Sequence, residues 1–383
     1  MDAVIEFQNI VKSYKSKTVL NGVSLTVRTG ELVALIGASG CGKTTLLKTV
    51  NRLGPADSGE VLLDGEPVSR LPLARLRRGI GYVVQDGGLF PHLTVEENLD
   101  LVLKNVKLPA AARPARVTEL LRMVELPPDE YRALYPCQLS GGQRQRVGVA
   151  RAFAADPGLI LMDEPFSALD PLTRAELQDT VVGLQRRTGK TILFVTHDMD
   201  EAVKLAQRIC FLEDGRVVQY DTPENVLRSP ADEYVADFVG KNRLWGNPEF
   251  IKARDIMKKN PSRVSRGRSV LQALQVMNHG GVDSVLVTEG KRLEGVVWLS
   301  DLQKFKDYRA PLDEFISQDY ISVYEDTSLQ KIIDTIDYSL SGVLPVISHQ
   351  GELLGYLTKS ILLATLCKQY ETPGAQSERS GVI

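Results

Sequence analysis

The stretch Gly37-Ala38-Ser39-Gly40-Cys41-Gly42-Lys43-Thr44 follows the apolar run 32–36 and precedes Thr45-Leu46-Leu47, where a helix is predicted to start. Between a buried strand and a helix, glycines adopt positive φ and let backbone N–H groups surround a polyphosphate. The helix N-terminus adds a partial positive charge. The Lys43 ammonium can reach β- and γ-phosphates, and the Thr44 hydroxyl can serve Mg²⁺. The pattern predicts a phosphate-binding loop that consists of Gly37, Ser39, Gly40, Cys41, Gly42, Lys43, Thr44 and Thr45.

A second apolar run, residues 159–162, ends in two carboxylates, Asp163 and Glu164. An acid at the end of such a strand is placed to hold the hydration shell of Mg²⁺. The adjacent acid can orient or deprotonate an attacking water. Taken alone, the acids also suit a helix N-terminus, because Pro165 follows, and the loop also suits a glycine turn with a solvated lysine. Together they predict a site for a polyphosphate and Mg²⁺, with Asp163 at the metal and Glu164 in catalysis.

The composition is that of an ordinary globular protein. The chain has 383 residues, of which 43% are hydrophobic, and its 46 basic and 48 acidic side chains leave a formal charge of −2. The length predicts two or three domains, and the near-neutral charge argues against a nucleic-acid partner. Four cysteines fit a reducing cytosol rather than a disulfide scaffold. We expect no signal peptide, and no run approaches the ~18 apolar residues that a membrane helix needs.

The chain divides into zones of different patterning. Residues 1–240 alternate β-rich apolar runs with amphipathic stretches, which predicts an α/β fold with a parallel or mixed sheet covered by helices. Residues 241–253 are a predicted linker. A weak repeat of about 60 residues then predicts two modules, 254–308 and 309–368, each with a helix, two strands and a closing helix; chance similarity between two small βα units is the alternative. Residues 369–383 lack apolar periodicity and are predicted to form a mobile tail.

Further motifs carry a family resemblance. Leu139-Ser140-Gly141-Gly142-Gln143 lies between the phosphate loop and Asp163, and it resembles the signature motif of ABC-type ATPases. The resemblance covers residues 1–240 and implies a P-loop ABC-type ATPase domain, with a mixed sheet and a helical subdomain. Other residues match this family's motifs and occur in the same order along the chain. Tyr14 resembles the aromatic residue that stacks on adenine, and Gln85 resembles the glutamine of a lid that contacts the metal and the transmembrane partner. Asp170 belongs to the segment 167–170, which resembles the family's D-loop, and His197 resembles the histidine beside the γ-phosphate.

These single residues are weak signals by themselves. Tyr14 alone is compatible with an ordinary half-buried aromatic, and Gln85 with a solvated loop residue. The resemblance implies catalytic roles for Glu164, His197 and Gln85, and metal contacts from Thr44, Gln85 and Asp163. It also implies a homodimer, in which residues 140–143 face the γ-phosphate on the other subunit and each ATP bridges two chains.

The region after Gln85 and the C-terminal repeat resemble parts of an importer. The segment Leu89-Phe90-Pro91 is apolar enough to need a partner or a core, and it resembles the surface that receives a coupling helix from a pore. The repeat resembles a tandem CBS pair. An ABC ATPase with such a pair resembles the energy-coupling subunit of quaternary-amine importers, which carry glycine betaine, carnitine, choline or proline.

This resemblance implies separate transmembrane permease subunits and an extracytoplasmic substrate-binding protein. It also implies a peripheral position at the cytoplasmic face of a prokaryotic cell membrane. One alternative is the ATPase of another solute importer, such as a sugar importer. Another is a soluble ABC ATPase that acts on DNA or ribosomes without a pore.

The repeat departs from the CBS pattern Gly-apolar-apolar-Thr-x-x-Asp. The first copy keeps Asp301 but has Trp298 in place of Thr, whereas the second keeps Thr358 but has Ile361 in place of Asp. We therefore do not expect a standard AMP or ATP site in each copy. A regulatory nucleotide such as cyclic di-AMP between two CBS pairs, and a purely structural role in dimerisation, both stay open.

Two segments of the C-terminal region carry opposite charge. Residues 251–268 hold seven basic and one acidic side chain, a formal charge of +6, and residues 311–339 hold seven acidic and one basic, a formal charge of −6. Such surfaces attract at low salt and are screened at high salt, with a Debye length of about 8 Å near 0.15 M. They suggest an ionic-strength switch that responds to osmotic stress, with two independently solvated faces as the alternative.

Overall fold

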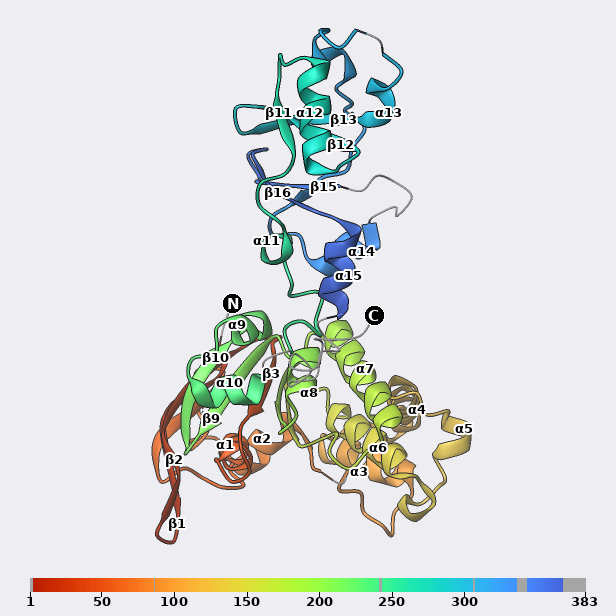
Figure 1. Ribbon diagram of the computed structural model, residues 1–383. Coiled ribbons are helices and arrows are strands. Elements are labelled where there is room, and N and C mark those ends of the chain that lie inside the picture. The colour runs from red at the N-terminus through yellow and green to blue at the C-terminus, as the bar shows by residue number, and fades with distance from the viewer. Residues whose placement is uncertain (1–2, 86, 241–242, 306, 336–342, 368–383) are drawn as a thin grey trace, which may run out of the picture. The chain divides into compact units, whose positions relative to one another are not determined.

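The protein folds into two compact units that divide between Val239 and Gly240. The structure, a computed structural model (Figure 1), describes most of the chain in five segments: residues 3–85, 87–240, 243–305, 307–335 and 343–367. The predicted tail, 369–383, and residues 241–242 of the predicted linker lie outside these segments.

A six-stranded sheet forms the centre of the first unit, in the order β10-β9-β3-β8-β7-β6. The strands from β9 to β6 are parallel, and β10 pairs with β9 in the antiparallel sense, which confirms the predicted mixed sheet. Strands β3 and β8 are buried along their whole length, so both of their faces are apolar. The strands are β3 (Leu32–Ile36), β6 (Ile80–Val83), β7 (Leu159–Asp163), β8 (Thr191–Val195), β9 (Arg208–Glu213) and β10 (Arg216–Asp221).

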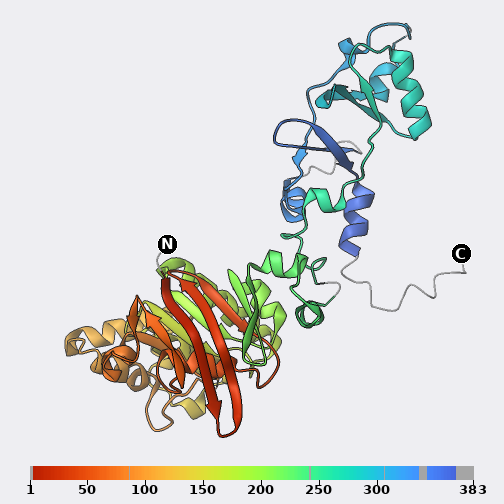
Figure 2. The ribbon, with the colours of Figure 1, turned by 90° about the vertical axis from the view of Figure 1, so that its left-hand side faces the viewer.

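A second, antiparallel sheet has the order β2-β1-β4-β5 and was not predicted from the sequence. Figure 2 shows its long strands β1 and β2 across one side of the unit. Buried side chains of this sheet, such as Ile5 and Leu25, share one core with Leu47 of helix α1 and Leu161 of β7. The elements are β1 (Ala3–Tyr14), β2 (Lys17–Arg28), β4 (Ser58–Leu63), β5 (Glu66–Pro67) and α1 (Lys43–Val50).

Between β6 and β7 the chain forms the helical part that the family resemblance implies. Helix α3 begins with a capping box between Thr94 and Glu97, and its apolar side, including Leu99, packs with α4 and α6. These helices are α3 (Val95–Asn105), α4 (Arg113–Met123), α5 (Pro128–Tyr131) and α6 (Gly141–Phe153). The other helices of the first unit are α2 (Leu73–Arg78), α7 (Pro171–Thr188), α8 (Met199–Leu205), α9 (Pro223–Arg228) and α10 (Glu233–Val239).

The second unit contains the predicted repeat twice. In each copy the middle strand of a three-stranded sheet pairs parallel to the first strand and antiparallel to the third. A short strand before each long helix adds to the predicted pattern. The elements of the first copy are β11 (Arg263–Ser265), α12 (Val270–Gly280), β12 (Ser284–Glu289), β13 (Arg292–Trp298) and α13 (Leu299–Leu302). Those of the second are β14 (Val323–Tyr324), α14 (Leu329–Thr335), β15 (Leu344–Ile347), β16 (Leu353–Leu357) and α15 (Lys359–Cys367).

The segments that precede the two copies are exchanged between them. Ile251 and Ala253, at the start of helix α11 (Ala253–Ile256), are buried in the apolar core of the second copy with Ile332. Conversely, Leu312 is buried in the core of the first copy with Val270. The segment before the first copy therefore completes the core of the second copy, and the segment before the second copy completes the core of the first.

This exchange places the two charged segments side by side. The Arg254 N–H donates to the Glu325 carbonyl (3.0 Å), and the Gly267 N–H donates to Asp313 Oδ1 (3.0 Å). Arg266 Nε lies 3.6 Å from Asp313 Oδ2, at a site where both side chains are exposed. Backbone hydrogen bonds and apolar packing join the segments, so the structure shows neither two independent faces nor surfaces held by charge alone. Asp337 of the acidic segment lies outside the described residues.

Within the described parts of the chain, no helix has both the length and the apolar character that crossing a bilayer requires.

Candidate functional site

The predicted site residues gather at one edge of the six-stranded sheet. The loop 37–42 follows β3, Asp163 ends β7, and His197 lies two residues beyond β8. Strand β8 lies between β3 and β7, and Val195 pairs with both Leu35 and Asp163, so the three strands end at the same level. Parallel strands present their carboxyl ends at one edge of a sheet, which is where ligands bind in open α/β folds.

The loop after β3 has a backbone that requires glycine. Gly37, Gly40 and Gly42 have φ angles of 152°, 79° and 111°. A Cβ atom on Gly37 would collide with the Leu212 carbonyl oxygen, and one on Gly42 would lie 2.8 Å from the Val19 carbonyl oxygen. Gly40 has open space around it, and its backbone is exposed. Neighbouring backbone atoms therefore pack closely against both ends of the loop, whereas its middle is exposed.

Lys43 is buried inside this loop with only 6% of its surface exposed. Its Nζ donates hydrogen bonds to the carbonyl oxygens of Gly37 (2.8 Å) and Ala38 (2.9 Å). A buried ammonium held by loop carbonyls keeps its charge available for an anion in the loop. Cys41 is a small buried residue beside it, and burial raises the pKa of its thiol.

A tyrosine from the far end of the first unit fixes the loop, which could not be foreseen from the sequence. The Tyr234 hydroxyl of α10 accepts a hydrogen bond from the Ala38 N–H (2.9 Å) and donates one to the Leu212 carbonyl (3.1 Å). No local pattern signals this contact, because Tyr234 and Ala38 are 196 residues apart.

Two side-chain oxygens of the kind that bind metal ions lie close together beside the loop. The Thr44 hydroxyl donates to Asp163 Oδ1 (2.6 Å), and Lys48 Nζ lies 3.7 Å from Asp163 Oδ2. Hydroxyl and carboxylate oxygens are ligands that suit Mg²⁺. Lys48 was not predicted, although its position one helical turn after Thr44 places the two on the same side of α1.

The remaining predicted catalytic side chains lie on neighbouring loops. His197 Nδ1 is 3.5 Å from Glu164 Oε2, and Glu164 has a positive φ of 46°, which is uncommon outside glycine. Gln85 Nε2 donates to Ser167 Oγ (3.2 Å), whose hydroxyl donates to the Glu164 carbonyl (3.1 Å). The structure thus connects Gln85, Glu164 and His197. Tyr14 ends β1 with 50% of its surface exposed, and Lys12 Nζ lies over its ring, 5.4 Å from the ring centroid.

The signature residues lie at the N-terminus of helix α6, with Ser140 as its cap. The Gln143 N–H donates to Ser140 Oγ (3.2 Å), and the Ser140 N–H donates to Gln143 Oε1 (2.9 Å), which forms a capping box. A Cβ atom on Gly142 would collide with Thr173 Cγ2 of α7. Asp170 caps α7, where hydrogen bonds from the Thr173 hydroxyl and N–H lower the pKa of its carboxyl.

The signature residues stay apart from the phosphate loop of their own chain. Figure 1 shows α6 and α1 in different parts of the first unit. Among the described residues, no hydrogen bond or ion pair joins residues 140–143 to residues 37–45. The two halves of the predicted site are thus both formed within one chain, but they are not brought together.

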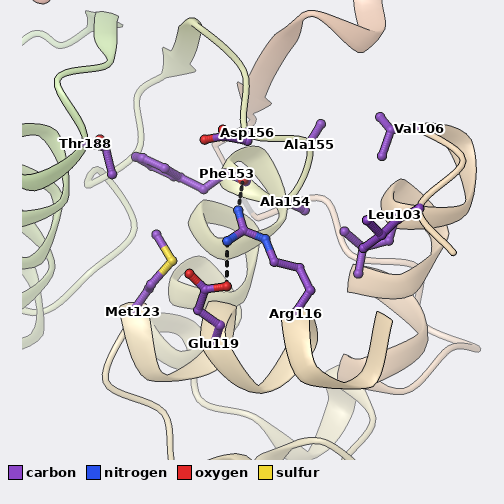
Figure 3. Close-up of a pocket in the computed structure, with 11 residues that line it drawn as sticks. Leu103, Val106, Arg116, Glu119, Met123, Phe153, Ala154, Ala155, Asp156 and Thr188 are labelled. Carbon is purple, nitrogen blue, oxygen red and sulfur yellow. Dashed lines mark hydrogen bonds and ion pairs between the residues drawn. The ribbon is translucent and has the colours of Figure 1, made fainter. Parts of the chain in front are cut away.

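The close-up in Figure 3 shows a separate cavity of about 330 Å³ beside α4 and the ends of α6 and α7. Arg116 lies within it and donates to Glu119 Oε2 (2.8 Å) and to the Phe153 carbonyl (3.2 Å). None of the predicted site residues lines this cavity.

Two known protein families match this chain. Residues 20–167 match the ABC transporter family, and residues 253–306 and 312–368 match the CBS domain family. The chain is 41% identical to the carnitine transport ATP-binding protein OpuCA of Listeria monocytogenes (strain 10403S), over 94% of this chain and 91% of that protein. The chain belongs to the ABC transporter ATP-binding proteins.

A further relative of this ABC transporter ATP-binding protein is the choline transport ATP-binding protein OpuBA of Bacillus subtilis (strain 168), with 42% identity over 94% of this chain and 95% of that one. A solved dimeric ATP-binding cassette in a post-hydrolysis state, bound to ADP and Pi, aligns with a TM-score of 0.53 and 36% identity, over 57% of this chain and 98% of that chain. The recognised family and fold are thereby confirmed, and the chain is an ATP hydrolase coupled to transport that uses ATP and Mg²⁺.

Proposed function

We propose that this protein is the energy-coupling subunit of an importer for quaternary-amine compatible solutes, with glycine betaine, carnitine, choline and proline as candidate solutes. The main support is that relatives named for carnitine and choline transport match 94% of the chain, including the C-terminal unit. In this proposal the protein lies at the cytoplasmic face of a prokaryotic cell membrane. It works there with separate permease subunits and an extracytoplasmic substrate-binding protein.

Within one chain, the loop 37–45 holds the phosphates of ATP, and Tyr14 stacks on the adenine. The Lys43 ammonium exchanges its carbonyl partners for phosphate oxygens, because a charge-assisted hydrogen bond to an anion is stronger than one to a neutral oxygen. Thr44, Asp163 and Gln85 are the side chains that hold Mg²⁺, which neutralises negative charge on the phosphates when bound.

Glu164 is the candidate general base. Its carboxylate accepts a proton from the attacking water, or orients that water, while His197 lies 3.5 Å from the same carboxylate and beside the γ-phosphate. The Gln85–Ser167–Glu164 connection links this base to the lid residue. A change in the lid can therefore alter the position of the base.

The site is completed by a second copy of the chain. Residues 140–143 form a capped helix N-terminus with an exposed serine and glycine, and they lie away from the phosphate loop of their own chain. In the homodimer they contact the γ-phosphate on the partner, so that ATP stabilises the closed dimer and hydrolysis releases it.

The Glu164→Gln variant tests this mechanism. It keeps the size of the side chain but removes the base, so we expect hydrolysis to fall by roughly a hundredfold or more, with a stable dimer in the presence of Mg-ATP. Size-exclusion chromatography with light scattering measures the dimer, and phosphate release measures the activity. A variant that stays monomeric with ATP contradicts the shared site.

Uptake of labelled glycine betaine tests the solute. Cells that express the whole transporter, with wild-type chain or Glu164→Gln, are compared at low and high osmolarity, with carnitine, choline, proline and maltose as competitors. Uptake that is lost in the variant and competed by quaternary amines supports the proposal. Competition by maltose alone points to a sugar importer. A separate purification of the chain from these cells shows whether an integral membrane protein accompanies it. If none does, the chain is a soluble ABC ATPase.

The C-terminal unit is proposed to regulate transport under osmotic stress. Trp298 and Thr358 occupy the same position in the two copies, and each copy lacks one of the two polar groups of a standard adenosine site. A regulatory nucleotide therefore requires contributions from more than one copy. Titration of the full-length Lys43→Ala variant with cyclic di-AMP and AMP tests this. Heat release with cyclic di-AMP supports a nucleotide regulator, and no heat with either supports a structural dimerisation role.

Ionic strength is the other proposed signal. The exposed contact between Arg266 and Asp313 is weakened by salt. ATP hydrolysis by the assembled transporter, measured over a series of KCl concentrations, should rise with salt. Activity that does not depend on salt contradicts the switch.

A further inference from the structure

A buried carboxylate lies behind the loop of His197 and has no part in the mechanism above. The Glu201 side chain on α8 is only 6% exposed. Its Oε2 accepts a hydrogen bond from the Thr196 hydroxyl (2.6 Å), and the same hydroxyl oxygen accepts one from the Asp198 N–H (3.0 Å). These bonds hold the residues on both sides of His197. Burial raises the pKa of Glu201, so its carboxylate needs nearby partners.

An arginine from α7 approaches this carboxylate from the opposite side. Arg174 Nε lies 3.9 Å from Glu201 Oε1, and Nη1 lies 3.7 Å from Asp198 Oδ2. Its Nη2 donates to the Leu169 carbonyl (3.1 Å), directly before Asp170. One guanidinium therefore contacts both the loop of Asp170 and the loop of His197.

The first two turns of α7 also contact the signature helix. Thr173 packs against Gly142 so closely that a Cβ atom there would collide. Arg146 of α6 donates from Nη2 to Glu176 Oε2 (3.0 Å) and, through Nη1, to the carbonyl of Val124 (3.0 Å). Arg146 is itself buried, with 7% of its surface exposed. Helix α7 is thus packed against α6 and linked through Arg174 to the His197 loop.

We infer that Arg174 and Glu201 are positioning residues that hold the His197 loop in register with α7, and through α7 with the signature motif of the same chain. This inference rests on the proposed function, because it assigns those motifs to ATP hydrolysis. In the proposed dimer, His197 serves the nucleotide of its own chain and residues 140–143 serve the partner's nucleotide. The Arg174–Glu201 contact therefore joins an element that serves one nucleotide to an element that supports the surface facing the other.

Arg174 and Glu201 should affect the rate of ATP hydrolysis but not the binding of ATP. Within the described residues, neither Arg174 nor Glu201 has a hydrogen bond or ion pair with the loop 37–45, so ATP binding should be nearly unchanged when they are altered. The reaction step depends on the placement of His197, and small misplacements of such groups cost up to about a hundredfold in rate. A change in kcat without a matching change in KM is the expected signature.

The test uses the full-length chain in its assembled transporter, with Arg174→Gln, Arg174→Lys and Glu201→Gln. We expect Arg174→Gln and Glu201→Gln to lower kcat for ATP hydrolysis by about tenfold to a hundredfold, with KM within about twofold. Arg174→Lys keeps the positive charge near Glu201 and should restore part of the rate. The double variant should lose less than the product of the two single losses, because the two residues act as one unit.

Lys204→Gln is the matched control. Lys204 Nζ lies 2.8 Å from Asp179 Oδ1, so this ion pair also joins α8 to α7, but it does not touch the loops of Asp170 or His197. We expect its kcat to stay within about twofold of wild type, since exposed ion pairs contribute little. Equal losses in Lys204→Gln and Arg174→Gln would mean that Arg174 only tethers the helices.

The proposed function is checked separately through Lys43→Ala and wild type. If wild type hydrolyses ATP and Lys43→Ala does not, the ATPase assignment stands, and unchanged kcat in Arg174→Gln then overturns the positioning inference alone. A rise in KM that accounts for the whole loss in either positioning variant overturns it too. Unfolding temperatures are recorded for each variant, and fluorescent ATP binding gives the fraction of folded sites, so that kcat is expressed per competent site.

Discussion

Each unit of this protein has a corner at which a strand is followed by a helix, and the two corners differ in backbone geometry. In the first unit, β3 and α1 are joined by the loop 37–42, whose glycines have positive φ and whose Lys43 is buried within it. In the second unit, Trp298 ends β13 and directly precedes α13, a helix of four residues without a side-chain cap. The topology is the same, but the second corner has no loop.

The difference is one of backbone geometry, because a strand followed directly by a helix lacks the open loop of the first corner. Such a loop aims several N–H groups at one point, in addition to the helix N-terminus. In the other copy, the Thr358 hydroxyl accepts a hydrogen bond from the Ile361 N–H (3.3 Å) and so caps its own helix.

Lys43→Ala should have the largest effect. It removes the buried ammonium of the first corner, and we expect ATP hydrolysis to fall by roughly a hundredfold to a thousandfold, as for other electrostatic groups that face developing charge. Phosphate release by the assembled transporter measures it. Lys48→Ala, on the next turn of α1, is the comparison and should lose less, because Lys48 meets the site only through Asp163. Equal losses would show that the position of Lys43 inside the loop has no special importance.

Gly42→Ala should strain the loop, whereas Gly40→Ala should be tolerated better. Gly42 has a φ of 111°, and a Cβ atom placed on it would lie 2.8 Å from neighbouring atoms, whereas Gly40 has open space. Gly40 also has a positive φ (79°), so the cost of about 1–3 kcal/mol for a forced positive φ applies to both variants, and the close contacts at Gly42 add to it. We therefore expect Gly42→Ala to have the lower unfolding temperature and the weaker ATP binding. Calorimetry and nucleotide titration measure both. If the two variants behave alike, close packing does not decide which glycine the loop requires.

Tyr234→Phe should have a moderate effect on the first corner. The change removes the hydroxyl that bonds the Ala38 N–H and the Leu212 carbonyl, at a cost of about 1–2 kcal/mol for the group left unsatisfied. We expect lower stability and an increase of KM for ATP by a few fold. Tyr308→Phe, which alters an exposed tyrosine of the second unit, is the control. An unchanged KM would mean that the loop keeps its shape without α10.

Asp301→Asn and Thr358→Val should have the smallest effect on ATP hydrolysis. Both change the polar groups of the second unit's corners, and neither corner has a phosphate loop. We expect kcat and KM for ATP to stay within about twofold of wild type, as for most surface substitutions. Steady-state hydrolysis at fixed ionic strength measures this. A large fall in kcat would reveal that these corners influence the ATPase unit.

Much of the fold near the site could be predicted because its signals are local. Residues 32–36 are a strand with the predicted bounds, and the predicted run 159–162 forms β7 together with Asp163, since a strand buried on both faces must be a continuous apolar run. Asp163 follows such a run, and the glycine loop follows another, so their chemistry is visible in neighbouring residues. The capped start of α6 at Ser140 is equally local.

Other features could not be predicted, because they join distant parts of the chain. The antiparallel sheet of the first unit and the Tyr234–Ala38 bond depend on long-range packing. The contact between Arg174 and Glu201 depends on how α7 packs beside the loop after β8, which no local pattern shows. Similarly, the repeat was visible in the sequence, but the exchange of residues 251 and 312 between the copies was not.

Spacing and side-chain chemistry act over a few residues, so the amino-acid sequence specifies the buried strands β3 and β7, the phosphate loop, the two carboxylates and the order of the motifs. Which residues contact and hold those groups, such as Tyr234 and Glu201, depends on the tertiary structure. Burial, hydrogen-bond partners and the separation of the signature residues from the phosphate loop of the same chain arise only when distant segments pack together.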